Sequence, residues 1–115
     1  MKLQDYIIQA DSKIIDAIEK MQIVKTRDLL IKKNNKIIGT LSEGDILRAI
    51  LRGKDLRSAV EDACNINFKF VKLGEEYKAA DIFQKEKIFI IPVFDKKFNL
   101  KNIITISNFF NELKK

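Results

Sequence analysis

Residues 29–53 read LLIKKNNKIIGTLSEGDILRAILRG, and this stretch decides the fold. The apolar run at its start is typical of a buried strand, and Asn34 and Asn35 tolerate the positive φ angles of a tight turn. An apolar return strand follows, and the polar residues SEGD then open a helix that stops at Gly53. The stretch therefore predicts a β-hairpin followed directly by a helix.

A second helix is predicted before this hairpin. Residues 11–21 read DSKIIDAIEKM, and their apolar side chains fall on one helical face. Asp11 or Ser12 is expected to cap its start. With a short lead-in near residues 3–8, the first half of the chain has the order helix, strand, strand, helix.

The same order recurs in the second half. Residues 74–84 have a helical pattern, the run IFIIPVF at 88–94 is rich in strand-forming residues, and SNFFNELKK closes the chain with a helix. From the first hairpin strand onward the two halves align without a gap, with Leu30 opposite Val93. Such self-similarity predicts a duplicated unit.

The two copies are expected to form one compact module. The first repeat spans residues 1–53, the linker 54–65 and the second repeat 66–115. A copy of about 50 residues barely offsets its chain entropy by burial, so we expect the two sheets to pack against each other. Pro92 lies inside the second hairpin strand and predicts that this strand is a sheet edge or begins there.

Composition narrows the function. The chain has 115 residues, no histidine and one cysteine, which excludes an intramolecular disulfide, a zinc site built from Cys and His, and a histidine base. The net charge is +6, but the basic residues are spread along the chain, which argues against nucleic-acid binding. No stretch is typical of a signal peptide or a membrane span, so we expect a cytoplasmic protein without a membrane partner and without catalytic activity.

The order of elements and the GTLSEGD motif at 39–45 resemble the CBS domain, and nearly the whole chain resembles a tandem CBS pair, or Bateman module. The segment GKDLRSAVEDAC at 53–64 is similar to the connector of such pairs. The resemblance implies an α/β (α+β) fold of two βαββα repeats packed sheet to sheet around a pseudo-twofold axis. It also implies homodimers, and clefts that in many relatives hold AMP, ADP, ATP or S-adenosylmethionine and regulate a fused or partner enzyme.

The motif supplies the candidate ligand-binding residues. Ser42 begins a helix, where unpaired backbone NH groups favour phosphate, and the resemblance implies that Asp45 accepts hydrogen bonds from ribose hydroxyls. Gly39 would allow a ligand to approach closely. Alternatively, Ser42 and Asp45 form an ordinary helix cap and Gly39 marks a strand irregularity. Thr105 and Asn108 hold the matching positions of the second copy, where an amide replaces the carboxylate, so that site is expected to be weaker or absent.

Two other residues are interpreted as structural. Phe98 stands where the first copy has Asn35, which predicts that the second hairpin tip packs against another surface, such as a second protomer. Cys64 is expected to be a buried, inert thiol.

Two functions remain open. The first is a regulatory module that senses an adenosine compound, with no cofactor required and no metal bound. The second is a non-binding dimerisation module of a larger enzyme. CBS pairs with similar short linkers occur ahead of sugar-phosphate nucleotidyltransferase domains, so the chain is expected to be the excised N-terminal regulatory part of such an enzyme.

Overall fold

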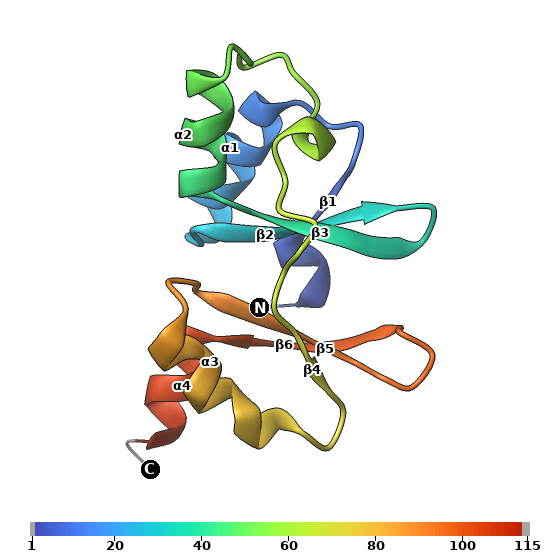
Figure 1. Ribbon diagram of the computed structural model, residues 1–115, viewed down its shortest axis with the longest axis vertical. Coiled ribbons are helices and arrows are strands. Elements are labelled where there is room, and N and C mark those ends of the chain that lie inside the picture. The colour runs from blue at the N-terminus through green and yellow to red at the C-terminus, as the bar shows by residue number, and fades with distance from the viewer. Residues whose placement is uncertain (1, 114–115) are drawn as a thin grey trace. The chain divides into compact units, whose positions relative to one another are not determined.

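The computed structural model describes residues 2–113, and its internal contacts divide the chain into two compact units, Met1–Phe68 and Lys69–Lys115 (Figure 1). Each unit has one three-stranded sheet with helices on one face. The predicted mixed α/β class with a duplicated unit is therefore confirmed. The packing of the two sheets around a pseudo-twofold axis stays a prediction.

The first unit is a mixed sheet covered by two helices. Its strand order is β1-β2-β3, with β1 parallel and β3 antiparallel to β2. The apolar face of the sheet and the inner faces of the helices share one core, which includes Ile14, Leu29 and Leu41. In chain order the elements are a 3-10 helix Leu3–Tyr6, β1 Ile7–Gln9, α1 Ile14–Val24, β2 Asp28–Lys33, β3 Lys36–Ser42, α2 Glu43–Leu51 and a 3-10 helix Val60–Asp62.

The hairpin and α2 form as the sequence predicts. Asn34 and Asn35 have φ angles of 49° and 66°, the pair of positive values that a two-residue hairpin turn needs. Gly53, with φ of 96°, follows the end of α2, where a residue with a side chain would be strained.

The predicted cap of α1 is wrong. The N-cap residue is Lys13, whose NH donates to the Asp16 carboxylate (2.9 Å), rather than Asp11 or Ser12. The linker explains the difference, because the carbonyl groups of Ser58 and Leu56 accept the first two helical NH groups of α1, each at 2.9 Å. Amides that a capping side chain would otherwise satisfy are bonded to a distant segment.

The linker belongs to the first unit by its contacts. Val60 is fully buried in the core, and its NH donates to the Ser12 carbonyl (2.8 Å). Further on, Asn65 exchanges two backbone hydrogen bonds with Thr40 of β3, at 2.7 and 3.0 Å. Residues 54–65 are therefore attached to the first repeat by backbone hydrogen bonds and by the burial of Val60.

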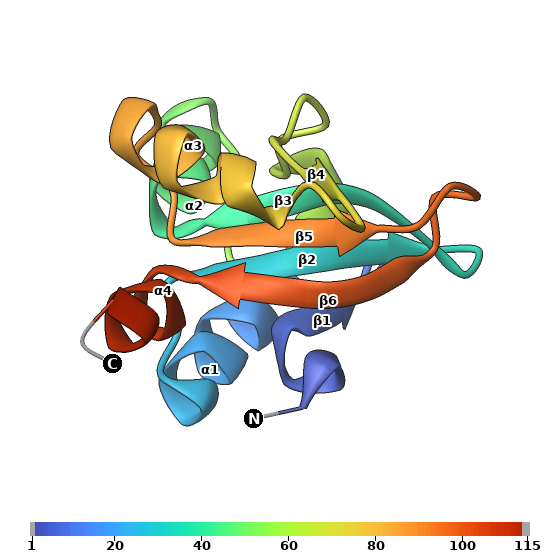
Figure 2. The same cartoon turned by 90° about the horizontal axis from the view of Figure 1, so that it is seen from below.

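The second unit repeats this order with shorter elements. Its sheet has the order β4-β5-β6, with β5 in the centre (Figure 2). The helix predicted at 74–84 is a 3-10 turn followed by a short α-helix. In chain order the elements are β4 Val71–Lys72, a 3-10 helix Glu76–Lys78, α3 Ala79–Lys85, β5 Ile90–Phe94, β6 Leu100–Thr105 and α4 Ile106–Leu113.

Pro92 lies in the central strand, so the prediction of an edge strand or strand start is wrong. It pairs with Ile103 of β6, whereas β4 pairs only with Val93 and Phe94. The ladder with β4 thus begins one residue after the proline, and the missing NH removes no hydrogen bond from that ladder. A very short β4 makes the proline compatible with the centre of the sheet.

The gapless alignment of the two copies is also wrong by one residue within the strand. Ile90 pairs with Thr105 as Asp28 pairs with Ser42, and Ile90 lies 62 residues after Asp28 while Thr105 lies 63 after Ser42. The second hairpin is one residue longer between these partners. The counterpart of Leu30 is therefore Pro92 rather than Val93.

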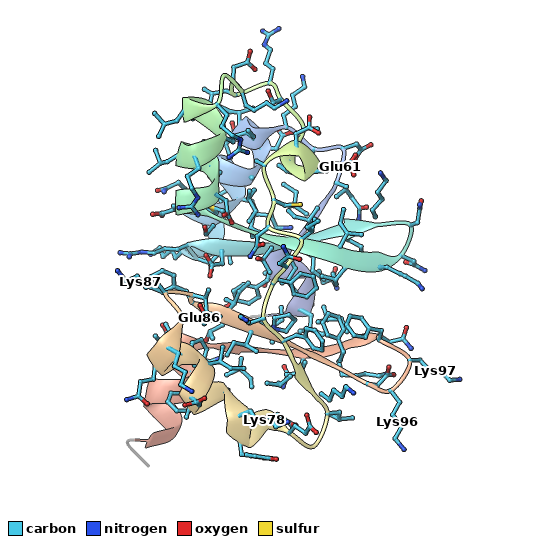
Figure 3. The ribbon with its side chains drawn as sticks, in the orientation of Figure 1. Glu61, Lys78, Glu86, Lys87, Lys96 and Lys97 are labelled. Atoms are coloured by element: carbon cyan, nitrogen blue, oxygen red, sulfur yellow. The ribbon has the colours of Figure 1, made fainter. Side chains whose placement is uncertain are left out.

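The tip of the second hairpin packs within its own unit. Phe98 has a φ of 65°, and its ring stacks on Phe94 with centroids 4.4 Å apart and meets Phe70 edge-on at 4.9 Å. Lys96 and Lys97 point away from this tip (Figure 3). Phe98 thus packs within its own unit while 45% of it stays exposed, and a contact with a second protomer stays a prediction.

Candidate functional site

The start of α2 brings Ser42 and Asp45 together. The Asp45 NH donates to Ser42 Oγ (3.0 Å), and the Ser42 NH donates in return to Asp45 Oδ2 (2.9 Å). This reciprocal pair is a capping box, and it satisfies two amides that a helix start leaves unbonded. The cap interpretation of these two residues therefore agrees with the structure, and their role in ligand binding stays a prediction.

Three amides at this helix start already have acceptors within the protein, and the phosphate-binding role of the helix start stays a prediction. The Glu43 NH donates to the Arg27 carbonyl (3.2 Å), in addition to the amides of Ser42 and Asp45 in the capping box. The amides of Ser42, Glu43 and Asp45 thus donate within the protein. A phosphate could use these amides only by displacing protein acceptors.

The Asp45 carboxylate is the charged hydrogen-bond acceptor at this helix start. Its second oxygen, Oδ1, accepts from Arg48 Nη2 at 2.9 Å. The Arg48 side chain is 63% exposed, whereas that of Asp45 is 16% exposed. Because an exposed ion pair contributes little, a ligand that offers better donors to Asp45 can displace the arginine.

The space beside Gly39 is filled by another part of the chain, the linker. A Cβ atom at this position would lie 2.8 Å from Cys64 Sγ and 2.9 Å from the Asn65 carbonyl oxygen. Gly39 also pairs with Ile31 at the register shift of the hairpin, in agreement with the predicted strand irregularity. The close approach that the glycine allows is that of the linker, and a ligand role for Gly39 stays a prediction.

Burial determines the chemistry of Cys64. The thiol is half-buried, its Sγ donates to the Glu61 carbonyl (3.5 Å), and desolvation by burial raises its pKa, with Asp45 adding a smaller effect of the same sign. A raised pKa lowers the thiolate fraction at neutral pH, which agrees with an inert thiol.

Asp28 is the residue that the sequence interpretation missed. It begins β2, lies directly opposite Ser42 in the register, and is only 4% exposed. The sequence signal that could have identified Asp28 is an acidic residue immediately before the apolar run of a buried strand. In the second unit the same position holds Ile90, opposite Thr105.

The second copy keeps the helix start but not its charge. The Asn108 NH donates to Thr105 Oγ1 (3.0 Å), as Asp45 does to Ser42. Thr105 is buried and Asn108 is exposed. The positions of the two carboxylates Asp28 and Asp45 are therefore neutral in the second copy, where Ile90 and Asn108 stand.

A shallow pocket of about 370 Å³ lies at the opposite end of the first sheet, where β1 and β2 end. Lys33 and Glu61 on its wall form an ion pair at 2.9 Å, and the hydrogen bond to Glu61 raises the pKa of Lys33. These two charges thus already satisfy each other, and no candidate residue lies in the pocket. The rest of the pocket is lined by Gln9, Ala10, Asp11, Lys32 and Asn34.

Among the side chains that the structure describes, those of residues 2–109, no group of three or more Cys, Asp or Glu is arranged to hold a metal ion. Over the same residues, no helix combines the length and apolar character needed to cross a membrane.

The fold is similar to solved structures of CBS domain proteins. A CBS domain structure matches with a TM-score of 0.84 and 20% identity, covering 95% of this chain and 87% of that one. A CBS domain pair/ACT domain protein from Thermotoga maritima matches with a TM-score of 0.73 and 18% identity over 99% and 97% of the two chains. A CBS-domain containing protein from Agrobacterium tumefaciens matches at 0.80 and 18%, over 93% and 87%.

A sequence comparison points in the same direction for the first repeat. Residues 3–52 match the sequence model of the CBS domain. An uncharacterized protein of Helicobacter pylori strain J99 is 27% identical over 78 residues, which is 66% of this chain and 24% of that protein. The chain thus spans about a quarter of the length of this curated relative. The association with a sugar-phosphate nucleotidyltransferase stays a prediction.

Proposed function

We propose that the chain is a regulatory CBS pair, in which the first repeat binds an adenosine compound at the start of α2 and controls a fused or partner protein in the cytoplasm. The observation that carries the proposal is the Asp45 carboxylate, which lies within the matched CBS domain at residues 3–52. The proposal includes no catalytic step, no metal and no nucleic-acid or membrane partner.

Ribose is the part of the ligand that this site suits best. A carboxylate has enough lone pairs to keep the capping bond to Ser42 and still accept from two vicinal hydroxyls. Arg48 would leave Asp45 Oδ1 and swing outward, because most of its side chain is already in water. The amides of Glu43 and Asp45 donate within the protein, so phosphate groups should add less affinity than the ribose does.

The experiment measures binding of AMP, ADP, ATP and S-adenosylmethionine by calorimetry and by thermal shift. A ligand present at a hundredfold over its dissociation constant should stabilise the chain by about 2.7 kcal/mol. Adenine without ribose is the matched ligand control and should bind much more weakly. Absence of any shift at millimolar concentrations of all four compounds would contradict the proposal.

Two variants locate the site. Asp45→Asn keeps an acceptor for the cap but loses the charge that makes hydrogen bonds roughly twice as strong, so affinity should fall about tenfold. Asn108→Asp places a carboxylate at the matching position of the second repeat and should leave the first-site affinity unchanged. Equal affinity of Asp45→Asn and the wild type would place the ligand elsewhere.

A second candidate function is a non-binding dimerisation module of a larger enzyme, such as a sugar-phosphate nucleotidyltransferase. The neutral residues at the second helix start, Asn108 and Ile90, favour this alternative for at least one repeat. Assembly that is unaffected by Asp45→Asn, together with no ligand-induced shift, would support it.

A further inference from the structure

The linker covers the turn that follows β1 in the first unit. The Glu61 NH donates to the Ala10 carbonyl (3.2 Å), and the Val60 NH donates to the Ser12 carbonyl (2.8 Å). Val60 is fully buried, and Ala10 is 5% exposed. The linker thus completes the core of the first unit at the point where the chain leaves β1.

The second unit has the same turn, but its side chains are exposed. Leu73 is the counterpart of Ala10, because the Leu73 NH donates to the Phe94 carbonyl (2.8 Å) as the Ala10 NH donates to the Lys32 carbonyl (2.9 Å). Leu73 is 58% exposed, and Tyr77 in the 3-10 helix that follows is 75% exposed. Single exposed apolar side chains are common, but these two lie on a turn whose counterpart is covered.

Residues 73–77, which we call the open turn, can accept an extended backbone. Gly74 has a φ of 94°, and a Cβ atom there would meet no heavy atom within 4 Å, so the space beside it is open. The Glu75 carbonyl accepts from the Lys78 NH (3.0 Å) and keeps a second lone pair for another donor. The Glu75 carboxylate and the Lys78 ammonium pair at 3.1 Å, so these two charges do not oppose an apolar contact.

We propose that the open turn binds a short extended segment of the fused or partner protein, with an aliphatic side chain in the place that Val60 takes on the first unit. Backbone NH groups of that segment donate to the Leu73 and Glu75 carbonyls, as those of the linker donate to Ala10 and Ser12. Main-chain hydrogen bonds then supply affinity, and the apolar anchor supplies specificity. The inference rests on the proposed control of another protein, but not on a ligand at Asp45.

The edge of β6 limits the length of this segment. In the first unit, Thr40 exchanges two backbone hydrogen bonds with Asn65 of the linker, next to Gly39. The counterpart of Thr40 is Ile103, whose NH donates instead to Oδ1 of Asn102 (2.8 Å). Because Asn102 stands at the position of Gly39, its side chain satisfies the amide that the linker satisfies in the first unit. The docked segment therefore covers the open turn and stops before β6.

NMR titration of the whole, isotope-labelled chain tests the docking with a synthetic peptide of residues 54–63, KDLRSAVEDA. The tethered linker keeps its own place on the first unit through its high effective concentration, so the peptide should shift the amides of the open turn. A peptide with Val60→Asp is the matched control and should cause no shift. No shift with the first peptide at millimolar concentration, or equal shifts with both peptides, would overturn the proposal.

Variants of the chain locate the contact. Leu73→Ser combined with Tyr77→Ser should weaken peptide binding at least about tenfold, because both apolar side chains lose their contact with the anchor. Ile23→Ser is the control, since Ile23 is 80% exposed on α1 of the first unit and should leave peptide binding unchanged. Equal weakening by the double variant and by Ile23→Ser would refute docking at the open turn.

Calorimetry with AMP, ADP, ATP and S-adenosylmethionine separates this inference from the ligand proposal. The double variant should bind an adenosine compound with wild-type affinity, because the open turn lies in the second unit and Asp45 in the first. Ligand binding without peptide binding would contradict the open turn alone. Peptide binding without ligand binding would support the open turn and contradict only the adenosine site.

Discussion

Replacement of Gly39 by alanine should destabilise the protein in the absence of any ligand. The new Cβ would lie 2.8 Å from Cys64 Sγ and 2.9 Å from the Asn65 carbonyl oxygen, both shorter than a normal contact. The thiol can rotate, but the carbonyl is fixed because Asn65 exchanges two backbone hydrogen bonds with Thr40. The β-strand must therefore move away from the linker.

The magnitude follows from two opposing effects. Overpacking of this kind costs about 1–3 kcal/mol, while the change from glycine to alanine recovers about 0.4–1 kcal/mol through the unfolded chain. Gly39 does not have a positive φ, so alanine brings no backbone strain of its own. We expect a net loss of about 1–2 kcal/mol, or a fall in Tm of roughly 4–10 °C.

Thermal unfolding followed by circular dichroism measures this loss. Gly44→Ala is the matched control, because its Cβ would lie 3.2 Å from the flexible guanidinium of Arg48 and the change improves helix propensity by up to about 1 kcal/mol. Gly39→Ala combined with Cys64→Ala should recover part of the loss, since only the carbonyl contact remains. A Gly39→Ala protein that melts at or above the wild-type temperature would refute the reasoning. Close approach of a ligand would then be the better explanation for a glycine at this position.

Three further outcomes follow from the described geometry. Phe98→Ala should cost about 1 kcal/mol in urea unfolding through loss of the stack on Phe94, and an unchanged midpoint would contradict a structural role for the ring. Hydrogen bonds, first of all from the Asn99 NH, lower the pKa of Asp95. Because the pKa in the folded protein lies below that in the unfolded chain, this turn adds to the free energy of unfolding above about pH 4. That stabilisation is lost as the pH falls through the folded pKa. The protection factor of the Asn99 amide, which is the intrinsic exchange rate divided by the observed rate, should therefore fall on acidification in the wild type but not in Asp95→Asn. Alkylation of Cys64 at pH 7 should be slower than that of an unfolded control, since burial raises its pKa, and equal rates would contradict the burial.

Local chemistry made the first hairpin and α2 predictable. Asn34 and Asn35 supply the required positive φ angles, and the SEGD start of α2 contains its own capping partners, so residues close in sequence determine both elements. The cap of α1 could not be predicted in this way. Its first amides are bonded by Ser58, more than forty positions along the chain, and no local pattern records that contact.

The register of the second hairpin shows why the alignment slipped. Because side chains alternate between the two faces of a strand, moving a strand by one residue exchanges its core and outer positions. Leu29 and Ile31 face the first core, and Ile91 and Val93 face the second, which fixes the equivalence at an offset of 62. In a run in which nearly every residue is apolar, the sequence cannot distinguish the two faces, and only the pairing does.

Comparison of the two copies distinguishes residues that the fold needs from residues that it does not need. Both copies retain a hydroxyl that caps the helix after the hairpin, Ser42 and Thr105, and both accept the NH group three residues on at 3.0 Å. A feature kept in both copies is needed for each helix to begin. The carboxylates of Asp28 and Asp45 occur only in the first copy, although the second folds with neutral residues in their places. The second copy therefore shows that these two acids are not required by the fold, and it is at these positions that we expect ligand binding to depend on the side chain.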